Sequence, residues 1–390
     1  MIKTKIAYIS YNGMNEALGS SQVLTYLYKL SSEYQYHLIS LEKPEDFSDK
    51  EKMDNLMQSL YKKDIHWHPI LYKTDKLGKL MNFFYLLAKT SKITKRENIK
   101  FAHCRSYFPA FVAYLLKLTY LFDTRGFAFD ESADVGSFNR QGFVFKLLKI
   151  VEKAIYRNAA GINKLSFEGR RTILENELFD KGDQIKNISV IPTCVDLDRF
   201  KFIHRNYQSP VKIGYVGTAV GWYDFEKTLE VIKKIGEQIP YHFTIFNSGQ
   251  HDYINEKLKQ FHIPAEKVNL EKVSFQEMPE RLAEFEIALF YIHPFFSKRA
   301  SAATKLGELL ATGIPVITNS GVGDHDFYIN NNDIGKIIDF NDLEKYNFKE
   351  IFENLRSEKT SQKCREIAER YFSVEKGVDD YKNIYRQIFI

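Results

Sequence analysis

The chain has 390 residues, of which 44% are apolar, 15% aromatic and 27% charged, with a formal net charge of +5. This length predicts two domains, and the composition is typical of a folded globular protein and excludes a disordered one. Three cysteines without C-x-x-C spacing indicate neither a disulfide framework nor a zinc site. The N-terminal pattern is that of a strand, and the most apolar window, residues 108–122, contains Lys117. We therefore expect a cytoplasmic protein with no signal peptide and no transmembrane helix.

The first half of the chain alternates strand and helix patterns. "KIAYIS" is expected to form a buried strand, and the helix "SQVLTYLYKLSSE" follows it, with Ser20 or Ser21 as the N-cap. The strands "YHLISL", "IKFAHCRS", "YLFDTRG", "GINK" and "ISVIP" come next, interrupted by helices at 109–118 and 143–159. This βαβ repetition predicts a parallel sheet with helices on both faces.

Residues 62–100 carry 10 basic and 3 acidic residues around a stripe of leucine and phenylalanine. This pattern is typical of a basic amphipathic helix. Such a helix is attracted to an anionic membrane surface, but the same pattern is also the solvated face of a helix that packs on a core.

The second half repeats the alternation after a break in periodicity. We expect an N-terminal domain at 1–195, a linker at 196–210, a C-terminal domain at 211–372, and a last helix at 373–390 that packs back on the N-terminal domain. The fold class is therefore α/β, with two Rossmann-like, doubly wound domains that face each other across a cleft.

Two loops of the second domain are candidates for a binding site. "YVGTAVGWYD" places Gly217 and Gly221 after a strand, without the G-x-G-x-x-G spacing of dinucleotide sites. In "SAATKLGELLATG", a helix beginning near Ser301 would direct free N–H groups and Lys305 toward an anion such as a diphosphate. Glu308, one turn later, suits a vicinal diol of a ribose, or else it pairs with Lys305 on a solvated face.

"SAATKLGELLATGIPVITNSGVGD" resembles the donor-site signature T-K-x-x-E-x-L-A-x-G-x-P-V-I of GT-B glycosyltransferases of family 4. "ISVIPTCVDLDRF", "GYVGTAVGWYD" and "LGSSQVLTYLYKLS" are similar to further segments of that family, and "HCRSYFPAF" and "FDTRGFAFDESAD" to a subgroup that assembles bacterial polysaccharides. The resemblance implies a nucleoside-diphosphate sugar donor held by the C-terminal domain and an acceptor near the N-terminal domain. It also implies retention of anomeric configuration, with no cofactor, no required metal and no nucleic-acid partner.

Carried over residue by residue, the resemblance makes Glu308 the residue that holds the donor ribose. The first glutamate of the family's E-x7-E motif falls on Ala300, so the usual contact to the sugar hydroxyls is missing, and we expect Ser301 or a main-chain amide to take its role. Lys298 and Arg299 stand in for cations that the family often carries after the first strand of this domain. The expected donor-binding residues are Glu308, Lys305, Thr304, Ser301, Arg299, Gly217, Thr218 and Gly221.

On the acceptor side the family often has a histidine at the end of the strand "YLFDTRG", and this chain has none there. The catalytic candidates are Asp123, Arg125, Asp130 and Glu131, and the acceptor-binding candidates are Gly19, Ser20, Ser21 and Gln22. The alternative for Asp123 and Arg125 is a structural ion pair at the end of a strand.

Two D-x-D strings, Asp196 to Asp198 and Asp324 to Asp326, are interpreted as loop acids, and no metal site is expected. The motifs together predict a retaining, metal-independent hexosyltransferase that acts on a glycan or polyprenyl-linked acceptor for bacterial surface polysaccharide, peripheral on the inner face of the plasma membrane. Two alternatives remain: a non-catalytic partner subunit with the same fold, and a nucleotide-sugar epimerase. Neither the sugar nor the nucleotide base follows from the sequence.

Overall fold

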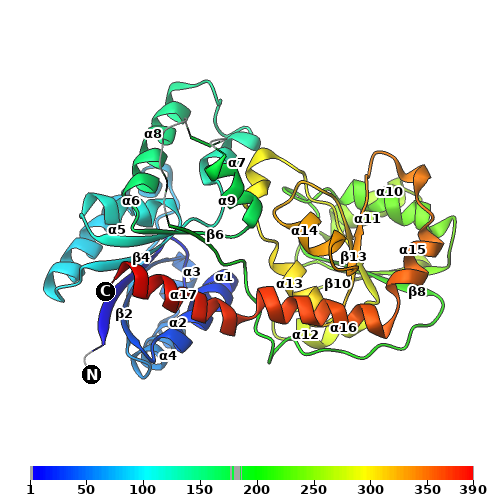
Figure 1. Cartoon of the computed structure of the whole chain (residues 1–390), viewed down its shortest axis with the longest axis horizontal. Helices are drawn as coiled ribbons and strands as arrows, with labels where there is room; N and C mark the ends of the chain where they lie inside the picture. Colours follow the sequence, from blue (N-terminus) through cyan, green and yellow to red (C-terminus); the bar gives the residue numbers. More distant parts are fainter. Residues whose placement is uncertain (1–2, 176–177, 180–184, 186, 390) are drawn as a thin grey trace. The chain divides into compact units, whose positions relative to one another are not determined.

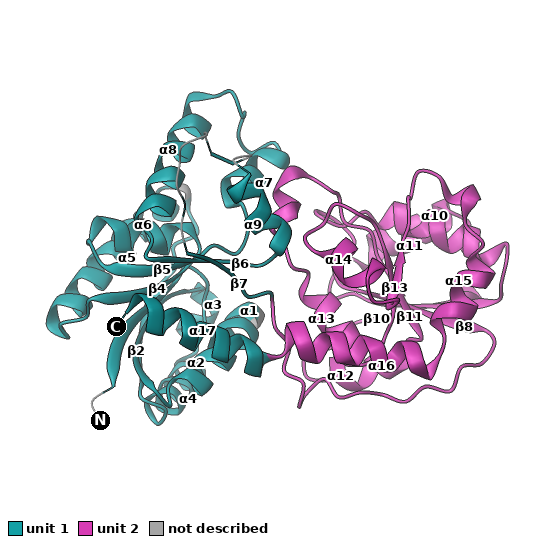
Figure 2. Cartoon of the chain, in the orientation of Figure 1, with its two compact units in different colours: residues 1–192, 374–390 teal, residues 193–373 magenta. Residues whose placement is uncertain are grey.

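A computed structural model of the chain describes residues 3–175, 178–179, 185 and 187–389 (Figure 1). The chain divides into two compact units, which we call unit 1 (residues 1–192 and 374–390) and unit 2 (residues 193–373) (Figure 2). Each unit is built on its own parallel sheet with helices around it. The expectation of two Rossmann-like, doubly wound α/β domains is confirmed.

Among the described residues, the sheet of unit 1 has seven parallel strands in the order β3-β2-β1-β4-β5-β6-β7. Its strands are β1 (Thr4–Ser10), β2 (Tyr34–Glu42), β3 (Ile65–Leu71), β4 (Phe101–Arg105), β5 (Thr119–Asp123), β6 (Gly161–Lys164) and β7 (Ile188–Val190). The strand order reverses between β1 and β4, and in the register of β4 with β5 Arg105 lies opposite Asp123. The carboxyl ends of these central strands therefore meet at one edge of the sheet.

The helices of unit 1 connect these strands. They are α1 (Ala17–Gly19), the π-helix η1 (Ser20–Leu24), α2 (Thr25–Leu30), α3 (Pro44–Ser48), α4 (Lys50–Tyr61), α5 (Lys76–Arg96), α6 (Tyr107–Leu115), α7 (Ala128–Asp134), α8 (Phe143–Asn158), α9 (Phe167–Leu174) and α17 (Val374–Ile388). The expected N-cap at Ser20 or Ser21 is wrong, because helical structure begins at Ala17 and both serines lie inside it. The C-terminal helix α17, red in Figure 1, belongs to unit 1 and packs on α2 and β5.

Unit 2 repeats the architecture with six parallel strands among its described residues, in the order β10-β9-β8-β11-β12-β13. The strands are β8 (Val211–Val216), β9 (Tyr241–Phe246), β10 (Val268–Glu271), β11 (Ile287–Leu289), β12 (Val316–Thr318) and β13 (Gly335–Ile337). The helices are α10 (Phe225–Gly236), α11 (His251–Gln260), η2 (Ala265–Lys267), α12 (Met278–Arg281), η3 (Leu282–Glu284), η4 (Phe296–Ala300), α13 (Thr304–Ala311), α14 (His325–Asn330), η5 (Leu343–Lys345), α15 (Phe348–Leu355), α16 (Glu358–Ile367) and η6 (Ala368–Phe372). Strands β11 and β12 are buried along their whole length, as expected for the centre of a parallel sheet covered by helices.

The segment predicted as a linker, residues 196–210, is part of unit 2. Arg205 fastens it by donating hydrogen bonds to the carbonyl oxygens of Thr312 (2.7 Å) and Phe285 (2.7 Å). The hydroxyl of Tyr207 lies 2.6 Å from that of Ser361. The sequence showed no periodicity here because the segment is ordered by side-chain hydrogen bonds rather than by a regular element.

Residues 62–100 contain a strand and a helix rather than one amphipathic helix, since β3 precedes α5. Asp75 caps α5 by accepting a hydrogen bond from the backbone N–H of Gly78 (3.0 Å). No helix in the described part of the chain is both long enough and apolar enough to cross a bilayer.

Candidate functional site

Each sheet has one point where the order of its strands reverses, and this point is where ligands bind in open α/β sheets. In unit 2 the reversal lies between β8 and β11. Gly217 follows β8 directly, and the chain after β11 leads through η4 into α13, which carries Lys305 and Glu308. The two loops selected from the sequence therefore meet at the expected edge.

Lys305 lies directly against Gly217. A Cβ atom built on Gly217 would be 1.3 Å from the Lys305 Nζ atom, and the glycine has a φ of +115°, which other residues rarely adopt. The Lys305 ammonium also lies 4.5 Å from the centre of the Tyr223 ring. The backbone conformation thus requires glycine at position 217, and a Cβ there would displace the end of the Lys305 side chain.

The Lys305 ammonium has no neutralising partner in the described part of the chain. No carboxylate of the described residues lies within 4.0 Å of it, and the Glu308 carboxylate accepts no hydrogen bond from them. Burial lowers the pKa of Lys305 to about 8, against the opposing effect of Glu308. Burial likewise raises the pKa of Glu308 to about 7, although Lys305 and Arg199 act against it. The alternative of a solvated Lys305–Glu308 ion pair does not describe this geometry, because burial shifts the pKa values of both groups and their charged atoms lie more than 4.0 Å apart.

Arg199 joins these residues from the segment that the sequence predicted as a linker. Its guanidinium carbon lies 3.5 Å from the centre of the Phe275 ring and the group donates a hydrogen bond to the Phe275 carbonyl oxygen. Its charge is close enough to influence the pKa of Glu308. We call Arg199, Gly217, Tyr223, Lys305 and Glu308 the Lys305 cluster. Arg199 was missed because its segment has no helical or strand pattern, and Tyr223 because one aromatic residue in a loop carries no signal.

The glycine loop after β8 is held in place by β9 and the loop that follows it. Asn247 donates to the Gly217 carbonyl oxygen (2.7 Å), and the side-chain oxygen of Gln250 accepts from the Ala219 N–H (2.8 Å). The Thr218 hydroxyl also contacts Gln250 (3.1 Å). Gly221 has a φ of +80° with no atom near its missing Cβ, so this glycine serves the turn and not a close contact. The loop is therefore preorganised beside Lys305.

Of two predicted donor residues, Ser301 differs from expectation and Arg299 stays a prediction. The helix α13 begins at Thr304, so Ser301 precedes it, and the Ser301 N–H donates to the Lys298 carbonyl oxygen (3.1 Å) instead of remaining free for an anion. Arg299 lies in η4 with its guanidinium carbon 5.4 Å from the Phe296 ring centre. Ala300 is completely buried. The free N–H groups at this edge are thus those of the first turn of α13, which starts at Thr304.

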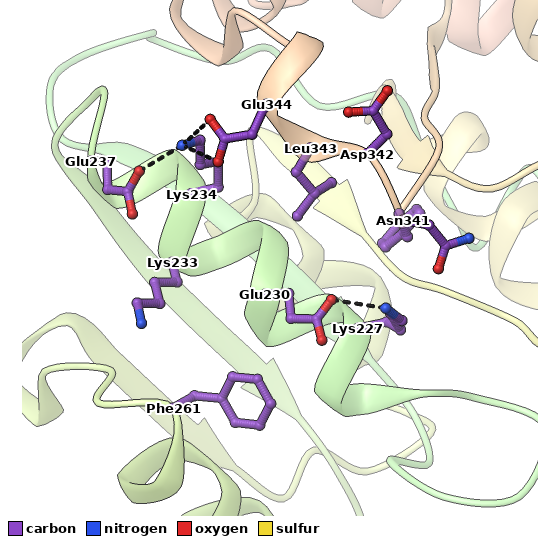
Figure 3. Close-up of a pocket in the computed structure, with 11 residues that line it drawn as sticks. Lys227, Glu230, Lys233, Lys234, Glu237, Phe261, Asn341, Asp342, Leu343 and Glu344 are labelled. Carbon is purple, nitrogen blue, oxygen red and sulfur yellow. Dashed lines mark hydrogen bonds and ion pairs between the residues drawn. The ribbon is translucent and has the colours of Figure 1, made fainter.

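Two pockets open on unit 2. One of about 420 Å³ lies beside the glycine loop and is lined by Gly221, Tyr223, Asp224, Tyr253 and His293, among others. A second, of about 490 Å³, lies between α10 and η5 (Figure 3). In this second pocket Lys234 pairs with Glu344 and Glu237, and Lys227 with Glu230, so these cations are neutralised. The first pocket shares Tyr223 with the Lys305 cluster and is therefore the one next to Lys305.

In unit 1 Asp123 ends β5 at the edge where the strand order reverses, and it is only 1% exposed. Asn163 donates to its Oδ1 atom (3.0 Å). Around its Oδ2 atom lie four further groups: the Tyr381 hydroxyl (3.3 Å), His103 Nε2 (3.6 Å), Arg125 Nη1 (3.6 Å) and Arg105 Nη1 (3.9 Å). We call Asp123 and these five residues the Asp123 cluster. The pair expected from the sequence, Asp123 with Arg125, is thus part of a larger buried network.

The charges of the Asp123 cluster follow from its burial. Burial alone would raise the pKa of Asp123, but Arg125 and the neighbouring His103 hold it well below its usual range. Burial lowers the pKa of His103, whose Nδ1 lies 2.6 Å from the Tyr385 hydroxyl. Asp123 is therefore an anion, and His103 is neutral at pH 7. A carboxylate so well satisfied is poorly suited to take up a proton as a base.

Of the remaining candidates of unit 1, Asp130 is held by two ion pairs, and Glu131 stays a prediction. Asp130 is buried and binds Arg140 (2.8 Å) and Lys149 (2.9 Å), one through each carboxylate oxygen. Glu131, the next residue of α7, is partly buried, with a carboxylate oxygen 3.4 Å from the position of a Cβ built on Gly126.

The loop after β1 needs glycine at position 19. A Cβ atom on Gly19 would be 2.0 Å from the Gly13 carbonyl oxygen. Ser20, Ser21 and Gln22 form the first part of the π-helix η1, with Gln22 buried. π-Helical turns are frequent at functional sites, so this segment stays an acceptor-side prediction.

The two D-x-D strings stabilise turns. Asp196 accepts hydrogen bonds from the N–H groups of Asp198 (3.0 Å) and Arg199 (3.3 Å). Asp326 accepts from the Ser320 hydroxyl (3.0 Å) and the Gly321 N–H (3.2 Å). Across the described residues no group of three or more His, Cys, Asp or Glu side chains is arranged to hold a metal ion.

Comparisons with known proteins place this geometry in a known fold. No protein-family model matches the chain, and no curated protein sequence matches it. Solved structures do: a sucrose-phosphate synthase from Thermosynechococcus elongatus matches with a TM-score of 0.71 at 16% identity over 99% of each chain. HepE from Anabaena, in complex with UDP and glucose, matches with a TM-score of 0.64 at 12% identity over 97% of this chain and 98% of its own. A UDP-N-acetylglucosamine 2-epimerase from Listeria monocytogenes, so named provisionally, matches with a TM-score of 0.56 at 12% identity over 97% of this chain and 94% of its own. At these identities the likeness shows the fold, which is the two-domain α/β fold called GT-B.

Proposed function

We propose that this GT-B protein is a glycosyltransferase that takes a hexosyl group from a nucleoside-diphosphate sugar with retention of configuration and without a required metal. The acceptor we propose is a glycan or polyprenyl-linked saccharide of bacterial surface polysaccharide synthesis. The observation that carries the proposal is the Lys305 ammonium, desolvated, unneutralised and seated on Gly217 at the switch point of unit 2. A partly buried cation with no counter-ion among the described residues is, in such a place, complementary to a diphosphate.

The residues of the Lys305 cluster divide the work of donor binding. Lys305 would neutralise the charge that develops on the diphosphate as the glycosidic bond breaks, assisted by the N–H groups at the start of α13. The Glu308 carboxylate, which has no hydrogen-bond donor among the described residues, would accept hydrogen bonds from the two ribose hydroxyls. Retention of configuration by a front-face route requires no protein nucleophile. The proposal therefore does not include the pair of carboxylates that a glycoside hydrolase uses.

Likeness to solved structures supports the donor class. HepE, which matches over nearly its whole length, is in complex with UDP and glucose. We therefore favour a UDP-sugar as the first donor to test.

Two other functions deserve a test. A non-catalytic partner subunit would account for Ala300 at the position of a family glutamate, but a scaffold has no need for the close Gly217–Lys305 contact. A nucleotide-sugar epimerase would use the same donor site, and one of the matching structures bears that name. An epimerase releases a changed sugar nucleotide without any acceptor, so product analysis without acceptor separates it from a transferase.

The experiment that tests the proposal is a thermal-shift series with UDP, GDP, ADP, CMP, dTDP and NAD on the wild type and on Glu308→Ala. A ligand at 100 times its Kd stabilises the folded state by about 2.7 kcal/mol, which raises Tm by several degrees. We expect one nucleoside diphosphate to raise Tm. In Glu308→Ala the apparent affinity for that nucleotide should be at least tenfold lower. A series in which no nucleotide shifts Tm would contradict the donor site and favour the partner subunit.

We also propose that the protein associates with the inner face of the plasma membrane through residues 62–100. Within this range the start of α5 exposes Leu77, Leu80 and Phe84, and the sequence of α5 has six basic and no acidic residues. Basic residues contribute about 1 kcal/mol each near an anionic membrane surface. Co-sedimentation with vesicles should therefore require anionic lipid and weaken in Leu80→Glu. Equal binding to neutral vesicles, or none to anionic ones, would contradict this part of the proposal.

A further inference from the structure

The switch point of unit 1 holds a second group of cations. The strand order reverses between β1 and β4, and Arg105 is the last residue of β4. Arg125 follows the neighbouring strand β5 by two residues. Both guanidinium groups therefore lie at the edge of the sheet where a ligand of a doubly wound domain is expected.

The Asp123 cluster contains two positively charged side chains and only one negatively charged one. Arg105 and Arg125 share one carboxylate, at 3.9 Å and 3.6 Å from the same Asp123 oxygen. His103 adds no negative charge, and burial keeps the Tyr8 and Tyr381 hydroxyls protonated by raising their pKa values. The other Asp123 oxygen is taken by Asn163. One buried carboxylate thus faces two arginines.

Arg105 also has N–H groups for which the described residues provide no hydrogen-bond acceptor. Its Nε and Nη1 atoms are buried, and neither has a hydrogen-bond partner among the described residues. The whole side chain is only about 5% exposed. Buried donors without an acceptor are rare in folded proteins and costly. A missing acceptor atom at this place is the simplest physical account of them.

The backbone that presents the two arginines is held in an unusual conformation. Arg125 has a φ of +57° and Ser106, directly after Arg105, a φ of +79°. Such left-handed conformations in residues other than glycine are uncommon and cluster at binding and catalytic sites. The carbonyl oxygen of Gly126 accepts hydrogen bonds from the Tyr107 hydroxyl (3.1 Å) and Lys164 Nζ (3.5 Å), both buried. The turn that carries Arg125 is therefore fixed before any ligand arrives.

We propose that Arg105 and Arg125 bind a phosphate group of the second substrate, the acceptor. Guanidinium groups match phosphate oxygens in a planar, bidentate way, and two of them at one site select an oxyanion over a neutral hydroxyl. Asp123 is then a positioning residue, since it holds both arginines and both of its oxygens already have partners. The word "acceptor" rests on the proposed function, whereas the phosphate site does not.

The phosphate can come from two kinds of acceptor: an isoprenyl diphosphate that carries a glycan, or a soluble sugar phosphate. Their shared chemistry is the phosphate oxyanion. Farnesyl diphosphate and glucose 6-phosphate serve as probes for the two sources, and inorganic pyrophosphate tests the oxyanion alone.

The test is isothermal titration calorimetry with these three probes on Lys305→Met, in which the unit 2 phosphate site is removed. We expect pyrophosphate still to bind this variant, and the further change Arg125→Gln to weaken that binding about tenfold or more. The matched control is Arg96→Gln, an exposed arginine of α5 that pairs with Glu97, and it should leave the affinity unchanged. Tighter binding of farnesyl diphosphate or of glucose 6-phosphate than of pyrophosphate would support the site and identify its source.

Loss of all pyrophosphate binding in Lys305→Met alone would overturn the proposal, and so would equal affinity with and without Arg125→Gln. If Arg125→Gln does not fold, Arg125→Lys replaces it, because lysine keeps the charge but loses the planar fork. Unchanged affinity in Arg125→Lys would contradict bidentate recognition. If no nucleotide raises the Tm of the wild type, the donor site is refuted, but the pyrophosphate binding measured here is unaffected. The two proposals can therefore be refuted separately.

Discussion

Replacement of Lys305 by methionine should have opposite effects on stability and on binding. In the free protein the ammonium is desolvated, lies over the Tyr223 ring and has no carboxylate within 4.0 Å among the described residues. Methionine has a similar length and no charge to desolvate. We therefore expect Lys305→Met to raise the Tm of unit 2 while it weakens the binding of a nucleoside diphosphate.

The magnitude follows from the pKa of Lys305, which burial lowers from 10.5 to about 8. Each pKa unit corresponds to about 1.4 kcal/mol, so the upper limit of the cost at pH 7 is about 3.4 kcal/mol. Since the residue is only partly buried by its exposed area, we expect a gain of about 1–3 kcal/mol, or a Tm higher by about 3–8 °C. The lost charge-assisted contact should weaken UDP binding about 10- to 150-fold.

The pH dependence provides a check on the sign. A lysine with a lowered pKa destabilises the fold below its folded pKa of about 8, and this cost disappears as the pH rises from 8 to 10.5. The stability advantage of Lys305→Met should therefore shrink across that range.

The assay is differential scanning calorimetry at pH 7 and pH 10, with and without UDP. The control is Lys233→Met, an exposed lysine of α10 in the other pocket (Figure 3), which should change neither quantity. A Lys305→Met protein that melts lower than the wild type and binds UDP as well would refute the assignment.

Three further outcomes are expected. A plot of UDP affinity against pH, measured by titration calorimetry, should be bell-shaped. The affinity should rise as Glu308 ionises near pH 7 and fall as Lys305 loses its proton above about pH 8. A flat profile would exclude both groups from UDP binding. Gly217→Ala should lower Tm and weaken UDP binding at least tenfold, because its Cβ would overlap Lys305 at a φ of +115°; wild-type affinity would contradict the contact. Burial lowers the pKa values of His37 and His68 to about 4, so unit 1 should lose stability as the pH falls from 6.5 to 4, and His68→Gln should reduce that loss in pH-dependent melting curves.

Much of the fold was readable from local pattern. Buried parallel strands are apolar along their length and helices show the 3.6-residue period, so the two doubly wound domains followed from the alternation of these patterns. The boundaries were less certain where hydrogen bonds replaced periodicity. Residues 196–210 were predicted to be a linker because they show no periodicity. Arg205 and Tyr207 fasten them to unit 2 through side-chain hydrogen bonds, which leave no repeating pattern in the sequence.

Only part of the Lys305 cluster could be identified from the sequence. Gly217, Lys305 and Glu308 were selected from the sequence, because glycine after a strand and a cation at a helix start have a local physical meaning. Arg199 and Tyr223 were not, since their relation to Glu308 and Lys305 arises only when distant loops meet at the switch point.

In unit 1 the sequence by itself determined that charged residues follow strand β5, because those residues stand in order along the chain. It did not determine what they do. The tertiary structure brought Arg105, His103, Asn163 and Tyr381 to the same carboxylate, from two other strands and the C-terminal helix. Whether a charge is buried, paired or left over depends on everything packed around it, and that sum is a property of the folded chain and not of any segment of it.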